Sequence, residues 1–413
     1  MAVLKLGPRS HLMGLRDTGT KIARTFQSTV KWISNVCLPS SNIPLVVGLT
    51  KMSLIIDQLP FTLIKGTFVV TGKNQCRRIS AVVVILFHLA VVLKWVLDNW
   101  LDTGEHSSPI WKFVLMYHCV SLFSSIMAFI VHITKLKGET IWLLNAALQI
   151  ERDCRAEGFE IVHLYYIGFI ALSKMAVVML PLPCFATGLL LPCIPPVWSS
   201  VIYLECNSWD DDGNSGFIFR MYGAILCYYL GFSVISTGVF VITVVMIYPA
   251  EVKLILIESI SRDLSSGRKP SIEVLITYRN LQMLTDLHNS VFRHPIMSIM
   301  VGAVTICESF ALYIIITSTL EVPVVVIILF SAVAVDLFIL IVGPFKIMAN
   351  PFVRSKELLQ SLKRMNTSGW VKRFVKSCPP SKLILGDGKF FDRATSLVIF
   401  SKCVDLLITF VLM

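Results

Sequence analysis

The sequence predicts an all-α, polytopic membrane protein with seven transmembrane helices, the N-terminus inside, the C-terminus outside and helical extensions on the cytosolic side. Of its 413 residues, 55% are hydrophobic and only 15% are charged, a balance that is unusual for a soluble chain of this length. Apolar stretches of about 20 residues recur, each long enough to cross roughly 30 Å of hydrocarbon. The distribution of Lys and Arg is the third observation, and it predicts the orientation.

The seven spans are expected at residues 79–98, 111–133, 164–192, 220–248, 296–318, 322–343 and 394–413. A further apolar stretch, residues 44–70, is interrupted by Lys51, Asp57, Pro60 and Lys65. A charge near the centre of a bilayer costs at least about 3 kcal/mol. We therefore expect a cytosolic or interfacial helix there, with an eighth span as the alternative.

The basic residues alternate between the loops. All but five of the 37 Lys and Arg residues lie in four segments: 1–78, 134–163, 249–295 and 344–393. The alternating loops carry none: 99–110, 193–219 and 319–321. By the positive-inside rule the N-terminus is cytosolic, and seven spans then place the C-terminus outside. Residues 1–35 lack the uninterrupted apolar core of a secretory signal, so we expect the first span to direct insertion.

Two features of the loops make this topology testable. The acidic loop 195–216 is expected outside, and its Cys206 either pairs with Cys193 or both stay free thiols, because spacing alone does not reveal connectivity. The Asn-x-Ser/Thr sequon at Asn366 lies in a loop expected inside. It should therefore remain unglycosylated.

Two cytosolic segments have helical periodicity. In residues 271–292 the apolar and aromatic side chains recur at helical spacing: Val274, Tyr278, Leu281, Leu284 and Phe292. Residues 354–365 form a basic amphipathic pattern with three leucines on one side: Leu358, Leu359 and Leu362. This second helix either lies on anionic lipid or packs against partner helices.

Several function classes find no support. The spans contain no HExxH, no GxSxG and no paired aspartates, and the eight His are scattered, so we expect neither an enzyme nor a cofactor. The net charge of +11 follows from topology and does not indicate nucleic acid. A transporter would show repeated halves, and the Pro-rich third span has no counterpart. A G-protein-coupled receptor has an external N-terminus, opposite to the Lys and Arg distribution.

Polar residues form one stripe on the last span. Members of the stripe recur at alternating steps of three and four: Thr395, Val398, Lys402, Asp405, Thr409 and Leu412. Polar groups inside a membrane face either a water-filled path or the bundle interior. The stripe therefore lines a pore shared by several copies, or it packs within one subunit while Lys402 snorkels to the interface and bonds a neighbour.

This arrangement resembles the arthropod chemoreceptor superfamily, the insect-type gustatory and odorant receptors. The resemblance covers the whole chain: seven spans, an inside N-terminus, basic cytosolic loops and a closing seventh span. Residues 377–400 look like the family's turn into that span, with Gly386 and Gly388 for the reversal and Asp392 or Thr395 as helix cap. The gustatory Thr-Tyr and Gln-Phe pairs are replaced here: Asp405–Leu406 and Leu412–Met413. The resemblance is thus to a divergent member.

The resemblance implies a ligand-gated, non-selective cation channel of the plasma membrane, in which each subunit contributes its last helix to the pore. The channel would be a homo-tetramer or a hetero-tetramer with related receptor subunits. Carried over by position, the pore-lining residues are Lys402, Asp405, Thr409, Leu412 and Met413. Thr409, Leu412 and Met413 would form the external gate, and Asp405 would lie deeper and favour monovalent and divalent cations. A G-protein-coupled receptor is the alternative function, followed by a small-molecule transporter.

The family's ligands, small organic tastants or odorants, bind among the outer halves of the spans. The side chains placed to contact such a ligand are Tyr117, His118, Phe185, Tyr222 and Tyr229, although each alone also suits structural packing. The expected organisation has four parts. They are a cytosolic N-terminal region (1–78), a six-helix bundle with ligand pocket and cytosolic extensions (79–343), a cytosolic anchor helix and turn (344–393), and the pore helix (394–413).

Overall fold

The computed structural model describes residues 41–412 with gaps at 57, 73–74, 102–108, 159–162, 196, 198–199, 201–205, 207–208, 210–214, 266–271, 294, 318–321, 366–367 and 387. Within them, seven helices are long and apolar enough to cross a membrane, which confirms the predicted number of spans. They are α3 (Gln75–Leu101), α4 (Ile110–Lys135), α6 (Leu164–Met179) with α7 (Pro181–Leu190), α9 (Phe217–Val239), α12 (Ile296–Thr317), α13 (Val324–Val342) and α16 (Thr395–Leu412).

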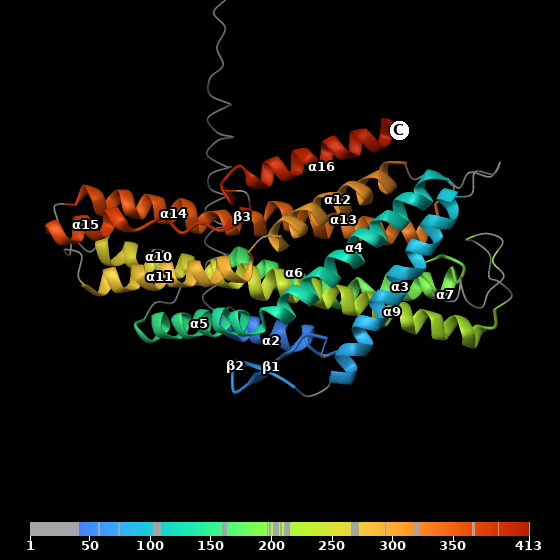
Figure 1. Ribbon diagram of the computed structural model, residues 1–413, viewed down its shortest axis with the longest axis horizontal. Helices are drawn as coiled ribbons and strands as arrows, with labels where there is room; N and C mark the ends of the chain where they lie inside the picture. The colour runs from blue at the N-terminus through green and yellow to red at the C-terminus, as the bar shows by residue number, and fades with distance from the viewer. Residues whose placement is uncertain are drawn as a thin grey trace, which may run out of the picture.

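The remaining long helices gather at one end of the molecule (Figure 1). We call them the extension bundle: α5 (Lys137–Ala156), α10 (Tyr248–Ser265), α11 (Ile272–Val291), α14 (Pro344–Arg364) and α15 (Gly369–Ser377). The fourth span, the π-helical segment η1 (Phe240–Ile247) and α10 run without a break for 49 residues. At 1.5 Å per residue this helix measures roughly 74 Å, more than twice the hydrocarbon thickness. Much of α10 therefore lies beyond any bilayer that α9 crosses.

The extension bundle has its own core. Leu358, Leu359 and Leu362 of α14 are buried, and they belong to one apolar cluster with Tyr278 and Leu281 of α11. All three leucines were predicted to lie on one side of a helix, and this side packs against other helices of the same chain. Of the two alternatives for residues 354–365, the structure confirms helix packing.

The segment that interrupted the span pattern folds in two parts. Residues Ile43–Ser53 form α2, which at 11 residues is too short to span a bilayer. The helix predicted beyond it is wrong, because β1 (Phe61–Ile64) and β2 (Thr67–Val70) form an antiparallel hairpin. The turn residues Lys65 and Gly66 both have positive φ, 50° and 75°, as a two-residue hairpin turn requires. The hairpin is held by Asn145 of α5, whose side chain bonds the backbone nitrogen and oxygen of Phe68 at 2.8 and 2.9 Å.

The structure decides between the two alternatives for Cys193 and Cys206. Cys193 and Cys206 form a disulfide, with their Cα atoms 5.7 Å apart. The bridge ties the end of the third span to the loop before α9, two segments that the sequence placed on the same side.

Glycines allow α7 and α9 to pack closely. A Cβ on Gly188 would lie 2.9 Å from the Cα of Ala224, and one on Gly231 would lie 2.9 Å from Sγ of Cys184. Such small residues let the backbones of membrane helices approach each other. Because this contact forms one wall of the cavity described below, the spacing of the two helices fixes its width.

We expect Gly188→Ala to lower the free energy of unfolding by about 1–3 kcal/mol, since the new methyl group meets backbone rather than a flexible side chain. The melting temperature of the purified protein in detergent measures this. Gly168→Ala is the matched control, because nothing lies within 4 Å of its added Cβ. It should leave stability unchanged or raise it by up to about 1 kcal/mol. Equal effects of the two substitutions would contradict the close approach.

Candidate functional site

A cavity of about 290 Å³ lies among the spans. Its walls come from α4, α6, α7, α9, η1, α12 and α13, so it lies inside the membrane-spanning half of the chain. The volume is close to the lower end of known small-molecule sites. The lining is mainly apolar and includes four phenylalanines: Phe123, Phe129, Phe169 and Phe330.

Of the five residues that the sequence suggested for ligand contact, His118 lines this cavity. His118 is buried, its ring packs edge-on against Phe330 with centroids 4.8 Å apart, and its Nδ1 has no hydrogen-bond partner among the described residues. The other four lie outside the lining. Tyr117 and Phe185 are half-buried, Tyr222 is 55% exposed, and Tyr229 contacts Ser80 of α3 through its hydroxyl.

Most hydroxyl groups of the lining are already bonded. Ser173 and Thr243 bond each other at 3.0 Å across α6 and η1. Ser125 and Thr187 each donate to the carbonyl four residues earlier, at 2.6 and 2.9 Å. These groups are satisfied within the chain and need no ligand.

Sequence reasoning missed several lining residues. Four free thiols reach the cavity from four different elements: Cys119, Cys184, Cys227 and Cys307. Asp336 of α13 also lines it. The signal for Asp336 was present, because an ionisable residue within a span indicates a function by default.

The second candidate site is the outer face of α16. On its inner face Cys403 is fully buried, its carbonyl accepts a hydrogen bond from Ser309 of α12 at 3.1 Å, and Phe410 stacks on Phe310 at 5.1 Å. Most of the predicted stripe lies on the opposite face, where Val398, Lys402, Asp405, Thr409 and Leu412 are exposed. Ser401, which the sequence analysis did not include, shares that face. Thr395, the first member of the predicted stripe, is instead buried and bonds Asp392.

The polar groups of this face bond only within α16 in the described chain. Lys402 Nζ lies 3.1 Å from Asp405 Oδ2, and Thr409 Oγ1 donates to the Asp405 carbonyl at 2.9 Å. With 17% of its residues buried, α16 is the least covered of the seven spans, which otherwise range from 28% to 72%. Figure 1 shows α16 at the edge of the helical array. Met413 lies outside the described residues.

Comparison with known proteins identifies the fold. No protein-family model and no curated protein matches the sequence. Two solved structures of the insect olfactory receptor OR5 from Machilis hrabei do match. One has 12% identity and a TM-score of 0.54 over 93% of this chain and 98% of that one. The other, in complex with eugenol, has 14% identity and a TM-score of 0.61 over 89% and 97%. The chain has the fold of the insect olfactory receptors.

In this olfactory-receptor fold, a compact turn connects α15 to the exposed α16. The turn contains β3 (Ile384–Gly386) and β4 (Lys389–Phe390), with φ of 124° at Gly386 and 75° at Gly388, values that favour glycine. Asp392 Oδ1 accepts from the Ala394 nitrogen at 3.0 Å and from Thr395 Oγ1 at 2.9 Å, so both predicted capping residues take part.

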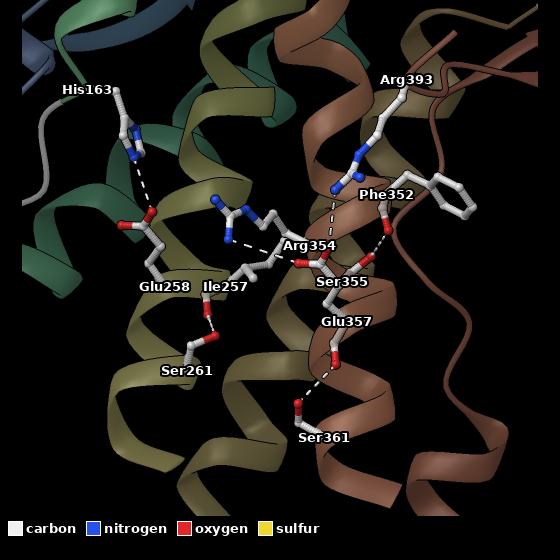
Figure 2. Close-up of polar contacts among 10 residues, drawn as sticks. All are labelled: His163, Ile257, Glu258, Ser261, Phe352, Arg354, Ser355, Glu357, Ser361 and Arg393. Carbon is white, nitrogen blue, oxygen red and sulfur yellow. Dashed lines mark hydrogen bonds and ion pairs between the residues drawn. The ribbon is translucent and has the colours of Figure 1, made fainter. Parts of the chain in front are cut away.

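The turn is fixed to α14 by packing and charge. Phe391 is fully buried against Phe345, with ring centroids 5.7 Å apart. Glu357 receives Arg393 from the turn at 3.2 Å and Arg354 from its own helix at 4.0 Å (Figure 2). These exposed ion pairs are worth at most about 1 kcal/mol each. The buried aromatic contact therefore holds the base of α16 in place.

A histidine that contacts two carboxylates of α10 makes the stability of the fold depend on pH. His163, which precedes α6, contacts Glu251 through Nδ1. Its Nε2 lies 3.3 Å from Glu258, as Figure 2 shows. Burial alone would lower the pKa of His163, but hydrogen bonds and the charges of the two carboxylates outweigh burial and raise the pKa to about 9.

Because the folded pKa exceeds the ordinary value of 6.5, this stabilisation is complete below about pH 6.5 and is lost as pH rises through about 9. We expect His163→Gln to cost roughly 1–3 kcal/mol at pH 6 and much less at pH 10. Melting temperatures of both proteins in detergent at the two pH values measure the difference. A cost that is equal at both pH values would show that the charge of His163 does not stabilise the fold.

Proposed function

We propose that this chain is a subunit of a chemosensory, ligand-gated, non-selective cation channel in the plasma membrane, responding to small organic tastants or odorants. One observation carries the proposal: the polar face of α16 is uncovered on the least buried span. Charged side chains such as those of Lys402 and Asp405 are costly inside the hydrocarbon of a membrane. Copies of the chain arranged around an axis would place this face against water instead.

The proposed assembly is a tetramer. Four copies of α16 would place Lys402, Asp405, Thr409 and Leu412 along a central pore, with Met413 at its end. A ring of four Asp405 carboxylates attracts cations, and the apolar Leu412 position supports closure by dewetting. The extension bundle, including the anchor helix and turn of residues 344–393, would hold the tetramer together on the cytosolic side.

The cavity is the proposed ligand site of the six-helix part, residues 79–343. It is apolar, lined by residues of five spans and supplied with few free polar groups, as sites for small organic molecules are. The similarity of the chain's fold to that of a receptor solved with eugenol, a small organic molecule, supports this assignment. A ligand that binds the open state more tightly than the closed state would open the channel.

Whole-cell recording tests the proposal. Cells expressing the chain should show ligand-evoked current with similar Na⁺ and K⁺ permeability when a broad tastant and odorant panel is applied. The current should persist when intracellular GTP is replaced by a non-hydrolysable GDP analogue. Responses that vanish under that replacement, or solute uptake without current, would overturn it.

An epitope tag before residue 1 tests the proposed orientation, in which residues 1–78 are cytosolic. The tag should stain only permeabilised cells, and the sequon at Asn366, which lies outside the described residues, should remain unglycosylated. Staining of intact cells would reverse the topology and favour a G-protein-coupled receptor.

A further inference from the structure

The cavity contains a carboxylate without a partner. Asp336 lies on the face of α13 that lines the cavity, together with Val326, Phe330, Val333 and Leu337. Among the described residues, the structure gives the Asp336 carboxylate no hydrogen bond and no ion pair, whereas the hydroxyls of Ser125, Thr187, Ser173 and Thr243 are all bonded. Asp336 is therefore an exception among the polar groups of the cavity wall.

The chain itself offers no cation there. The described lining contains no Lys and no Arg. An ionised carboxylate without a counter-ion is costly among apolar walls, and intramembrane carboxylates are usually paired. A ligand that carries a positive charge would supply the missing partner.

The surroundings define the rest of that ligand. His118 contributes a second polar atom without a partner, Nδ1, and its ring contacts Phe330, which lies about two helical turns from Asp336 on α13. The four phenylalanines of the lining suit an aromatic ring and can also contact a cation through their faces. A volume of about 290 Å³ restricts the ligand to a small molecule.

We propose that the cavity binds small arylalkylamines in their ammonium form, with Asp336 as the counter-ion and His118 as the hydrogen-bond partner for a polar group at the far end of the molecule. The role of such an amine as the activating ligand rests on the proposed function; its binding does not. This ligand class follows from the unpaired charge of Asp336 in the cavity wall.

Matched ligand pairs test this proposal. The probes are 2-phenylethylamine and 2-phenylethanol, which share a carbon skeleton and differ in the ammonium group, and 4-(2-aminoethyl)phenol, which adds a hydroxyl for His118. Binding is measured as a ligand-dependent rise in melting temperature of the purified full chain, and gating as evoked current. The variants are Asp336→Asn, which removes the charge, and Asp336→Glu, which retains it.

We expect the amines to bind the wild type more tightly than the alcohol does. Asp336→Asn should weaken amine binding by at least about 30-fold, the usual effect of removing one partner of a buried charge pair, and should leave the alcohol unchanged or bound more tightly. Asp336→Glu should restore much of the preference for amines. His118→Phe should weaken only the phenolic amine. A cooperative melting transition without ligand, at a temperature no lower than that of the wild type, shows that each variant is folded.

The outcomes separate the two proposals. Amine binding that Asp336→Asn abolishes supports the inference even if no compound evokes current, in which case the channel function fails. Current evoked by the alcohol as well as by the amines, with a ratio that Asp336→Asn does not change, overturns the inference and leaves the channel standing. Absence of amine binding to a folded wild type also overturns it.

Discussion

Replacing Thr409 by tryptophan is expected to abolish ligand-evoked current without loss of surface expression. Thr409 is exposed on the polar face of α16, so an indole there meets no other part of its own chain. In a tetramer four such rings would project into the proposed pore. The side chain of Thr409 bonds only the Asp405 carbonyl, so its removal should cost little stability.

Voltage clamp and surface biotinylation of the same cells give the two readouts. Val411→Trp is the matched control, because Val411 lies two positions further along α16, is half exposed and is not part of the stripe. It should retain current. Normal current in Thr409→Trp, or equal loss in both variants, would remove Thr409 from the ion path.

Replacing Glu151 by alanine is expected to cause the largest loss of stability, about 3 kcal/mol or more. Glu151 of α5 is buried and accepts three hydrogen bonds: from Ser41 Oγ at 2.8 Å, from the Asn42 nitrogen at 2.6 Å and from the Tyr248 hydroxyl at 2.9 Å. Each buried donor left without a partner costs about 1–3 kcal/mol. The carboxylate thus joins the start of α2 and the start of α10 to α5.

Thermal unfolding of the purified protein in detergent measures this loss. Glu157→Ala removes an exposed carboxylate at the end of the same helix and should leave the melting temperature nearly unchanged. Glu151→Gln, whose amide oxygen still accepts, should fall between the two. A melting temperature of Glu151→Ala close to that of the control would mean that the three donors find water or other partners.

The spans and the extension helices could be predicted because their signals are local. About 20 apolar residues suffice to cross a bilayer, and the spacing of Val274, Tyr278 and Leu281 alone indicates one buried helical face. The hairpin at residues 61–70 could not be predicted in this way. Its strands are four residues long and depend on Asn145, which is distant in the sequence.

The cavity was harder to predict than the fold. Its wall combines residues from five spans, and an apolar side chain that lines a cavity gives the same sequence signal as one that packs in a core. Aromatic residues with polar tips are the more selective signal for ligand contact, yet of those predicted His118 lines the cavity and Tyr222 is exposed. Asp336 carried a clearer signal than any of these, because its charge within a span needs a partner.

The position of the polar stripe on α16 could be predicted from the sequence, but the surface that it faces could not. Steps of three and four placed Lys402, Asp405 and Thr409 on one face, and the structure leaves that face exposed. Among the described residues no other helix covers it. In the proposed tetramer its partner surface belongs to other copies of the chain, so spacing within one sequence could predict the face but not what lies opposite.

Thiol modification of Thr409→Cys during recording tests the central claim, that the exposed face of α16 lines the ion path. A cationic methanethiosulfonate reagent is first applied to the wild type, where reaction with the exposed Cys76 or the four cavity thiols sets the background. The native Cys403 of α16 is fully buried on the opposite face and should not react. In Thr409→Cys the reagent should block the current irreversibly, faster when ligand holds the channel open, and a reducing agent should restore the current. Current that persists in Thr409→Cys channels shown to carry the label would contradict the claim.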